Sequence, residues 1–494
     1  MIQLIAYIYL IMICAFLPMY MRTGYYELGE AKAWCYYFIS IAFIIIIPIA
    51  DFFYHKRKIS DYKDIIIGKI KKERELTYTQ IFLLATLFSC ILSFVFSIDK
   101  RTAFFGYEGW RCGLLTMLFI LFYCHIYSRF SKLNMYMLYL CLVVPFLEFG
   151  HGVLNRMGIY PVEIYASNNS FLATLGNINW YSGFLSIFVP LGMGILYRIT
   201  LFTYDFWMAF IYTTLGFVAI FMQGSEGAVL IIIAAFVLLI WHSLDDRTLI
   251  KRLLIVAMAL GVSMSLVDVM FNILRFNYTY ESNHLMNICL SHAGFIIFAA
   301  AFFLYQMERL FAEIKVPFRE KDYKIIYGVL LAIGVIGTGY YFCNIFSDDF
   351  GNGRGLIWRV SLDIFKSLSP WQQLVGVGQD CMSSYIQKDG QLTAFVLDSF
   401  NGTMLTNAHN DILTVLIERG LIGVVCYIGL FAAILYELLK KKEKEPAAIV
   451  CGLPIFSYLV FNLVSFAQIT SMPYAYILIG LGVSMTRKYA NYFS

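Results

Sequence analysis

Long apolar runs separated by short polar segments dominate this chain of 494 residues. Runs of about 20 apolar residues are long enough to cross the hydrocarbon core of a bilayer as α-helices. Only 14% of the residues are charged and 60% are hydrophobic, whereas a soluble domain carries roughly 25% charged residues. The sequence therefore predicts an all-α polytopic membrane protein.

The hydropathy pattern predicts about 12–14 transmembrane helices. The candidate spans lie near residues 2–21, 33–54, 80–98, 112–127, 135–154, 178–197, 205–223, 227–241, 253–273, 285–305, 325–346, 420–439, 446–464 and 474–486. The Ser-, Pro- and Gly-rich stretches that would mark a linker are absent from the sequence, and so are visible internal repeats. We therefore expect one membrane domain with a sizeable external insertion.

The basic residues predict the orientation of these spans. With the N-terminus placed inside, 25 of the 37 Lys and Arg residues fall in loops on the inner side and 12 fall on the outer side. This split follows the positive-inside rule. It predicts cytoplasmic termini and an external loop at 347–410. The net charge is +5, but the basic residues are distributed according to the membrane topology. We therefore expect no nucleic-acid partner.

Three regions follow from this topology. We expect an N-terminal bundle of about eleven helices over 1–346, an extracytoplasmic loop with short interfacial helices over 347–410, and an interfacial helix followed by the last spans over 411–494. The basic inner segment Lys63–Arg74 fits either an amphipathic surface helix or an ordinary inner loop.

The first polar motif of the external loop is GRGLIWRVSLDIFKSLSPWQQLVGVG, Gly353–Gly378. Residues 356–368 have helical spacing, with Trp358, Leu362 and Phe365 on an apolar face and Arg359, Asp363 and Lys366 on a charged one. Arg354 stands at the start of this helix between two glycines. Arginine suits a bidentate grip on phosphate, although Arg354 and Arg359 also fit simple contacts with lipid headgroups.

The second motif is NAHNDILTVLIERGLIG, Asn407–Gly423. A single helix over 411–439 would be about 43 Å long, against a hydrocarbon core of about 30 Å. We therefore expect a short outer helix that begins at Asn410 and Asp411 and a break at Gly420. A helix start favours an anion, and His409 lies just before it. The alternative is that Asn410 only caps the helix and His409 has no role.

The sequence predicts no metal site. Eleven cysteines show no Cys-x-x-Cys spacing, and no cluster of His, Asp and Glu has metal-ligand spacing. Most of the cysteines lie in apolar runs, where they suit packing.

The two external motifs resemble the O-antigen ligase superfamily, which includes O-antigen ligases, O-antigen polymerases and protein O-oligosaccharyltransferases. The matching positions are Arg354, Trp358, Pro370, Gly376, Gly378, His409, Asn410, Leu413, Glu418, Gly420 and Gly423. Two earlier segments also resemble the family: SIDKRTAFFGYEGWRCG at Ser97–Gly113 and GNINW at Gly176–Trp180.

The resemblance implies an enzyme in a bacterial inner membrane with its active site on the extracytoplasmic side. The expected donor is a glycan on undecaprenyl diphosphate, and the expected acceptor is a hydroxyl of a glycan, of lipid A core or of a protein. It implies a metal-independent transfer with no cofactor. Arg354, Arg359 and Arg111 would bind the diphosphate, and His409 would act as base or as a donor to the diphosphate. Trp358, Asn410 and Asp411 would support the site.

One position departs from the family pattern. A short outer turn that usually reads Ser-Arg-Gly is Ser225-Glu226-Gly227 here. A carboxylate cannot replace a guanidinium as an anion ligand, so Arg111, Arg101 or Arg359 would have to supply that contact. The other interpretation is structural, with Ser225 as an N-cap and Glu226 in the first turn of a helix.

A transporter is the alternative function, because flippases of lipid-linked oligosaccharides also have about fourteen helices. A flippase should carry charged residues in the middle of its helices and related halves. The ionisable residues of this chain gather instead in the external loop, which favours an enzyme.

Overall fold

The computed structural model describes residues 2–55, 76–314, 317, 319–344, 347–441 and 447–486. The predicted segment Lys63–Arg74 lies outside the described residues. Within them, eleven helices are long and apolar enough to cross a membrane, and three more apolar helices are shorter. The prediction of an all-α polytopic membrane protein is confirmed.

The long apolar helices are α1 (Ile2–Met19), α2 (Leu28–His55), α4 (Tyr78–Val95), α7 (Met135–Arg156), α8 (Ile178–Arg198), α9 (Tyr204–Met222), α10 (Val229–Ser243), α11 (Arg247–Asp268), α13 (Ala293–Glu313), α14 (Glu320–Asn344) and α19 (Asp411–Lys441). The three shorter ones are α6 (Leu114–Phe130), α20 (Ala448–Phe461) and α21 (Met472–Thr486). Several begin at a polar N-cap whose side chain accepts a backbone N–H, as Thr77, Asn134 and Asn177 do for α4, α7 and α8.

The remaining elements are short and lie between the long helices. They are α5 (Lys100–Phe105), β1 (Phe171–Leu172), β2 (Gly176–Asn177), η1 (Glu226–Ala228), η2 (Val269–Ile273), α12 (His284–Leu290), α15 (Phe350–Ser367), α16 (Pro370–Val375), α17 (Met382–Ile386) and α18 (Gly390–Ser399). β1 and β2 pair antiparallel and lead directly into α8.

Each of the fourteen predicted spans overlaps an apolar helix, but both boundaries of one span were wrong by eight residues. The span predicted at 285–305 is divided between α12 and α13, which begins at Ala293. His292 adopts a left-handed conformation with φ +63° between them, and this conformation stops a helix. Hydropathy alone does not reveal such a turn.

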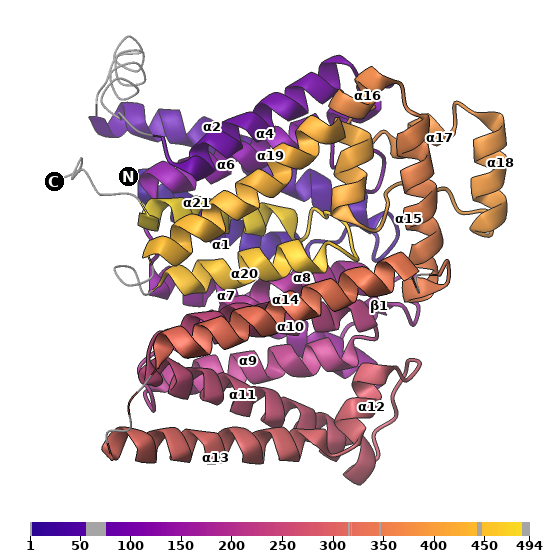
Figure 1. The fold of residues 1–494 in the computed structure, drawn as a ribbon. Helices are drawn as coiled ribbons and strands as arrows, with labels where there is room; N and C mark the ends of the chain where they lie inside the picture. The colour runs from indigo at the N-terminus through magenta and orange to yellow at the C-terminus, as the bar shows by residue number, and fades with distance from the viewer. Residues whose placement is uncertain are drawn as a thin grey trace.

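The bundle has a buried centre and an exposed edge. α8 is buried along its whole apolar span and packs against α9 and α20. By contrast, no residue in the apolar span of α14 is buried, and α13 is almost as exposed. Figure 1 shows α13 at the edge of the bundle and α15–α18 gathered at one end of it. The start of α1 lies at the opposite end (Figure 1).

Which end faces the cytoplasm stays a prediction from the charge distribution. The placement of α1 and α15–α18 at opposite ends of the bundle agrees with it (Figure 1).

Several ionisable side chains are buried inside spans, among them Asp268, Lys32 and Glu148, so the helix interiors are less free of charge than the sequence suggested. Lys32 of α2 donates to the carbonyl groups of Leu17 (3.1 Å) and Pro18 (2.6 Å) at the end of α1. Glu148 of α7 accepts from the N–H (3.1 Å) and the hydroxyl (2.5 Å) of Thr174. Both groups satisfy backbone at helix ends and in loops, which is a structural role.

Candidate functional site

A tight turn introduces Arg354 into α15. Gly351, Asn352 and Gly353 all have positive φ, at +61°, +62° and +82°, and such a run is available mainly to Gly and Asn. The regular part of α15 begins just after this turn, as the sequence predicted. The buried face of α15 differs from the prediction, because Ile357, Val360, Ser361 and Ile364 join Trp358 in the interior while Leu362 is exposed.

The guanidinium of Arg354 is half-buried and has no carboxylate partner in the described part of the chain. Nε donates to the carbonyl of Val464 (2.9 Å), Nη1 to that of Gly351 (2.7 Å), and Nη2 to Oδ1 of Asn179 (3.4 Å). Burial lowers the pKa of Arg354. Because a guanidinium has five N–H groups, two stay available to a ligand. An anion is the ligand that this uncompensated charge favours.

His409 lies beside this cation. Its backbone is left-handed at φ +45°, its N–H donates to Oδ1 of Asn407 (3.0 Å), and its ring meets the ring of Phe466 edge-on with centroids 4.9 Å apart. Burial, and then the nearby charge of Arg354, lower the pKa of His409 to about 4. The imidazole is therefore neutral near pH 7, which is the form that accepts a proton.

The two residues after His409 build the helix start. Asn410 Oδ1 accepts the N–H of Leu413 (3.1 Å), so Asn410 is the N-cap of α19, and its Nδ2 donates to the carbonyl of Leu463 (2.8 Å). Asp411 is buried, and its carboxylate accepts the N–H of Ala467 (3.3 Å). Both residues join α19 to the segment after α20, which is the supporting geometry that the sequence suggested for them.

The predicted break in α19 is confirmed. Gly420 has φ +66° and ψ −169° inside the helix, so a short outer part at 411–419 precedes the membrane span. The backbone of Leu374 and Val375 in α16 lies against Gly420 where a side chain would be. The segment that follows α16 is held against α19 because the N–H of Val377 donates to the carbonyl of Ile417 (3.0 Å).

The other two predicted phosphate ligands are already engaged. Arg359 is exposed and forms an ion pair with Asp348 at 2.6 Å. Arg111 is held by Glu30 of α2 through Nε (2.8 Å) and Nη2 (2.6 Å). Arg101 is exposed on α5. Of the predicted cations, Arg354 alone combines partial burial with a charge that no carboxylate of the described residues offsets and with an electrostatic effect on His409, whereas carboxylates offset the charges of Arg359 and Arg111.

The two earlier sequence motifs converge on the same region. Asn179 of the GNINW segment accepts from Arg354, and Gln468 Nε2 donates to the Asn179 carbonyl (3.1 Å). In the loop before α6, the N–H groups of Tyr107 and Cys112 both donate to Asp380 (2.8 Å each). Sequence reasoning named neither Asn179 nor Phe466 as a site residue. Asn179 lay in a quoted motif, but no pattern in the sequence signals Phe466.

The contacts of the turn at Ser225-Glu226-Gly227 indicate a structural role rather than anion binding. Glu226 accepts the N–H of His284 (3.2 Å). Ser225 stands at the N-cap of η1 and Glu226 lies in its first turn, as the structural interpretation expected, but the side chain of Ser225 makes no capping hydrogen bond. Arg156 contacts this turn through Nε and Nη2, which donate to the Gln223 carbonyl (3.2 and 2.6 Å). Because Arg156 is buried and its donors bind backbone carbonyl groups, its role at this turn is structural.

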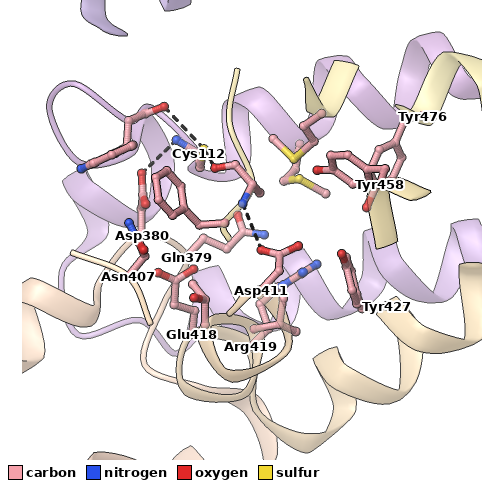
Figure 2. Close-up of a pocket in the computed structure, with 17 residues that line it drawn as sticks. Cys112, Gln379, Asp380, Asn407, Asp411, Glu418, Arg419, Tyr427, Tyr458 and Tyr476 are labelled. Atoms are coloured by element: carbon pink, nitrogen blue, oxygen red, sulfur yellow. Dashed lines mark hydrogen bonds between the residues drawn. The ribbon is translucent and has the colours of Figure 1, made fainter. Parts of the chain in front are cut away.

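A small, partly open chamber lies behind Phe466. It is lined by the side chains of Asp380, Asp411, Glu418 and Arg419, with Tyr427, Tyr458 and Tyr476 at one end (Figure 2). About 50 Å³ is open to the centres of water-sized molecules, which is room for a few waters. Burial raises the pKa of Asp380 to about 6, against the opposing effect of the N–H groups of Cys112 and Tyr107.

Comparison with known proteins identifies a family over part of the chain. Residues 211–428 match the family model described as O-antigen ligase. The match runs from α9 into α19, so it contains both Arg354 and His409, and it confirms the resemblance drawn from the two external motifs. Curated proteins gave no match to the chain.

Proposed function

From the match of residues 211–428 to the O-antigen ligase family, we propose that this chain transfers a glycan from undecaprenyl diphosphate to an acceptor hydroxyl. Membrane glycan transfer of the ligase or polymerase type is what the family supports in general. The observation that carries the proposal for this chain is the pair formed by Arg354 and His409. An unpaired guanidinium beside a neutral imidazole provides one anion ligand and one proton acceptor.

The proposed chemistry follows from these two side chains. The acceptor hydroxyl gives its proton to a ring nitrogen of His409 as its oxygen attacks the anomeric carbon of the donor sugar. The bond from that carbon to the diphosphate oxygen breaks, and negative charge grows on the leaving diphosphate. The two free N–H groups of Arg354 stabilise this charge more in the transition state than in the ground state. In this scheme no metal ion or other cofactor takes part, and membrane lipid carries the donor.

We place the site at the extracytoplasmic face of a bacterial inner membrane, because the charge distribution puts α15–α18 outside. In this proposal the donor diphosphate binds beside Arg354 and His409. Neither residue lines the neighbouring chamber, and the ring of Phe466 stands between His409 and that chamber. The flippase alternative gains no support from Lys32 and Glu148, because both are used to satisfy backbone groups.

The test is transfer by purified protein from an undecaprenyl diphosphate glycan to three acceptors, namely free glycan, lipid A core and protein. We expect one acceptor to be used, and we expect His409→Asn to lower the rate by 10²–10⁴-fold, as loss of a general base does. Asn is chosen because it tolerates the left-handed backbone at this position. A variant with more than about a tenth of the wild-type rate would exclude His409 as the base. Movement of the donor across vesicles without transfer to any acceptor would favour the flippase.

A further inference from the structure

The chamber behind Phe466 carries more negative charge than its basic side chains offset. Asp380, Asp411 and Glu418 are each less than 9% exposed, and Arg419 is the basic side chain among them. Arg111 also acts on Asp380, but its guanidinium is engaged by Glu30. With all groups ionised, three carboxylates would face one guanidinium. Buried charges without partners are strongly unfavourable, so the chamber needs a positive ligand.

Two buried polar side chains face the chamber with atoms that have no partner in the described part of the chain. Gln379 is 2% exposed, and neither Oε1 nor Nε2 forms a hydrogen bond. Oε1 of Glu418 is likewise buried and unpartnered. Figure 2 shows Gln379 among the carboxylates. Unsatisfied groups of this kind are rare in folded proteins and point to something that they bind.

The carboxylates differ in how well the backbone satisfies them. Asp380 accepts two N–H groups at 2.8 Å, and Asp411 accepts one at 3.3 Å. Glu418 is under the electrostatic influence of both Asp380 and Asp411. Glu418 also accepts the backbone N–H of Asp380. Arg419 donates to Sγ of Cys90 at 3.5 Å, and among the described residues it forms no ion pair within 4 Å. The three acids therefore line one chamber whose basic side chain pairs with none of them directly.

We propose that this chamber is a proton-binding site in which Asp380, Asp411 and Glu418 share an exchangeable proton. Three buried acids that line one chamber with a single basic side chain cannot all ionise, so the set keeps a proton. The amide of Gln379 supplies a donor and an acceptor to the protonated set. A metal ion fits less well, because in the part of the chain that the structure describes no group of three His, Cys, Asp or Glu is arranged to hold one.

The position of the proton gives it a structural task. Asp380 holds the loop before α6, Glu418 belongs to the outer part of α19, and Asp411 holds the segment after α20. The phenol groups of Tyr427, Tyr458 and Tyr476 complete the titratable surroundings of the chamber. The proton thereby removes repulsion at the point where three external segments meet.

Infrared spectroscopy of the purified wild-type protein tests the proposal directly. Near pH 7 we expect the carbonyl band of a protonated carboxyl group, shifted in heavy water and lost in both Glu418→Gln and Asp380→Asn. The exposed variant Asp398→Asn on α18 is the control and should keep the band. Absence of the band in the wild type would overturn the proposal, as would a band that survives in both chamber variants.

Thermal unfolding provides a second measurement that separates a proton from a metal cation. Asp380→Asn mimics the protonated acid, since its amide oxygen still accepts from Tyr107 and Cys112. At about pH 8 its melting temperature should exceed that of the wild type by a few degrees, and the difference should shrink at about pH 5. A wild-type melting temperature that rises with Na⁺ at constant ionic strength, but not with pH, would assign the chamber to Na⁺ and refute the proton.

Discussion

The neutral His409 predicts how the stability of the protein responds to acid. The pKa of His409 is lowered from 6.5 to about 4 in the folded protein. Between these values the unfolded chain takes up a proton that the folded chain refuses, so the free energy of unfolding falls as the pH falls. A difference of about 2.5 pKa units corresponds to about 3 kcal/mol of lost stability. In His409→Asn this loss should be absent.

Asp380 acts with the opposite sign in nearly the same range. Its pKa is raised from 3.8 to about 6, so the folded chain takes up a proton before the unfolded chain does. As the pH falls from about 6 to about 4, this uptake adds roughly 3 kcal/mol of stability. The two residues therefore nearly cancel in the wild type. His409→Asn should expose the contribution of Asp380 and become more stable in acid.

The assay is the unfolding midpoint of wild type and variant in the same detergent at about pH 7 and about pH 4.5. Contributions from all other titrating groups cancel in the difference between the two proteins. We expect that difference to shift in favour of His409→Asn by about 3 kcal/mol at the lower pH. A difference that does not depend on pH would mean that His409 titrates normally, and the argument for a neutral base would fail.

Three further predictions follow from the geometry. Gly420→Ala should lower the free energy of unfolding by about 2–4 kcal/mol, because it forces a side chain at a positive φ against the backbone of α16. Gly390→Ala is the control in the same unfolding assay, because the space around Gly390 is open. Arg354→Lys should lose most transfer activity since the guanidinium fork is lost while the charge is kept, whereas Arg359→Lys should keep it; equal rates for the two variants would remove Arg354 from the site. Ala394 is exposed on α18, and Ala394→Cys in a variant of this protein without other cysteines should react with an impermeant thiol reagent in intact cells. Reaction only after the membrane is opened would mean that the predicted topology is inverted.

The sequence allowed the membrane spans and the two local turns of the site to be predicted, because these depend on neighbouring residues. The break at Gly420 followed from a helix too long for the bilayer, and the cap at Asn410 followed from the residue type. The span at 285–305 was misplaced because hydropathy does not sense the backbone of His292. Similarly, helical spacing found the charged face of α15 correctly, but it could not tell which apolar side chains meet protein and which meet lipid.

Long-range partners explain the rest of the difference. Arg111 and Arg354 look equally suited to phosphate in the sequence. Glu30 lies 81 positions before Arg111 and offsets its charge, whereas Arg354 meets only carbonyl groups and Asn179. The ring of Phe466 against His409, and the gathering of Asp380, Asp411 and Glu418, likewise join segments that are far apart along the chain. Only the packed fold decides which of several arginines stays available.

We expect the exposed helix α14 to transmit changes in membrane thickness to the candidate site. No residue in the apolar span of this helix is buried, and contacts with Asp245 and Val237 hold it through Lys324 and Tyr327 near its first end. Its other end stops at Asn344, six residues before α15 begins. Near that end the ring of Tyr341 faces the ring of Phe350 at the start of α15, with centroids 6.3 Å apart. Because the tilt of an isolated span follows bilayer thickness, we expect the length of the acyl chains to influence the position of the glycine turn at Arg354, and with it the distance from Arg354 to His409.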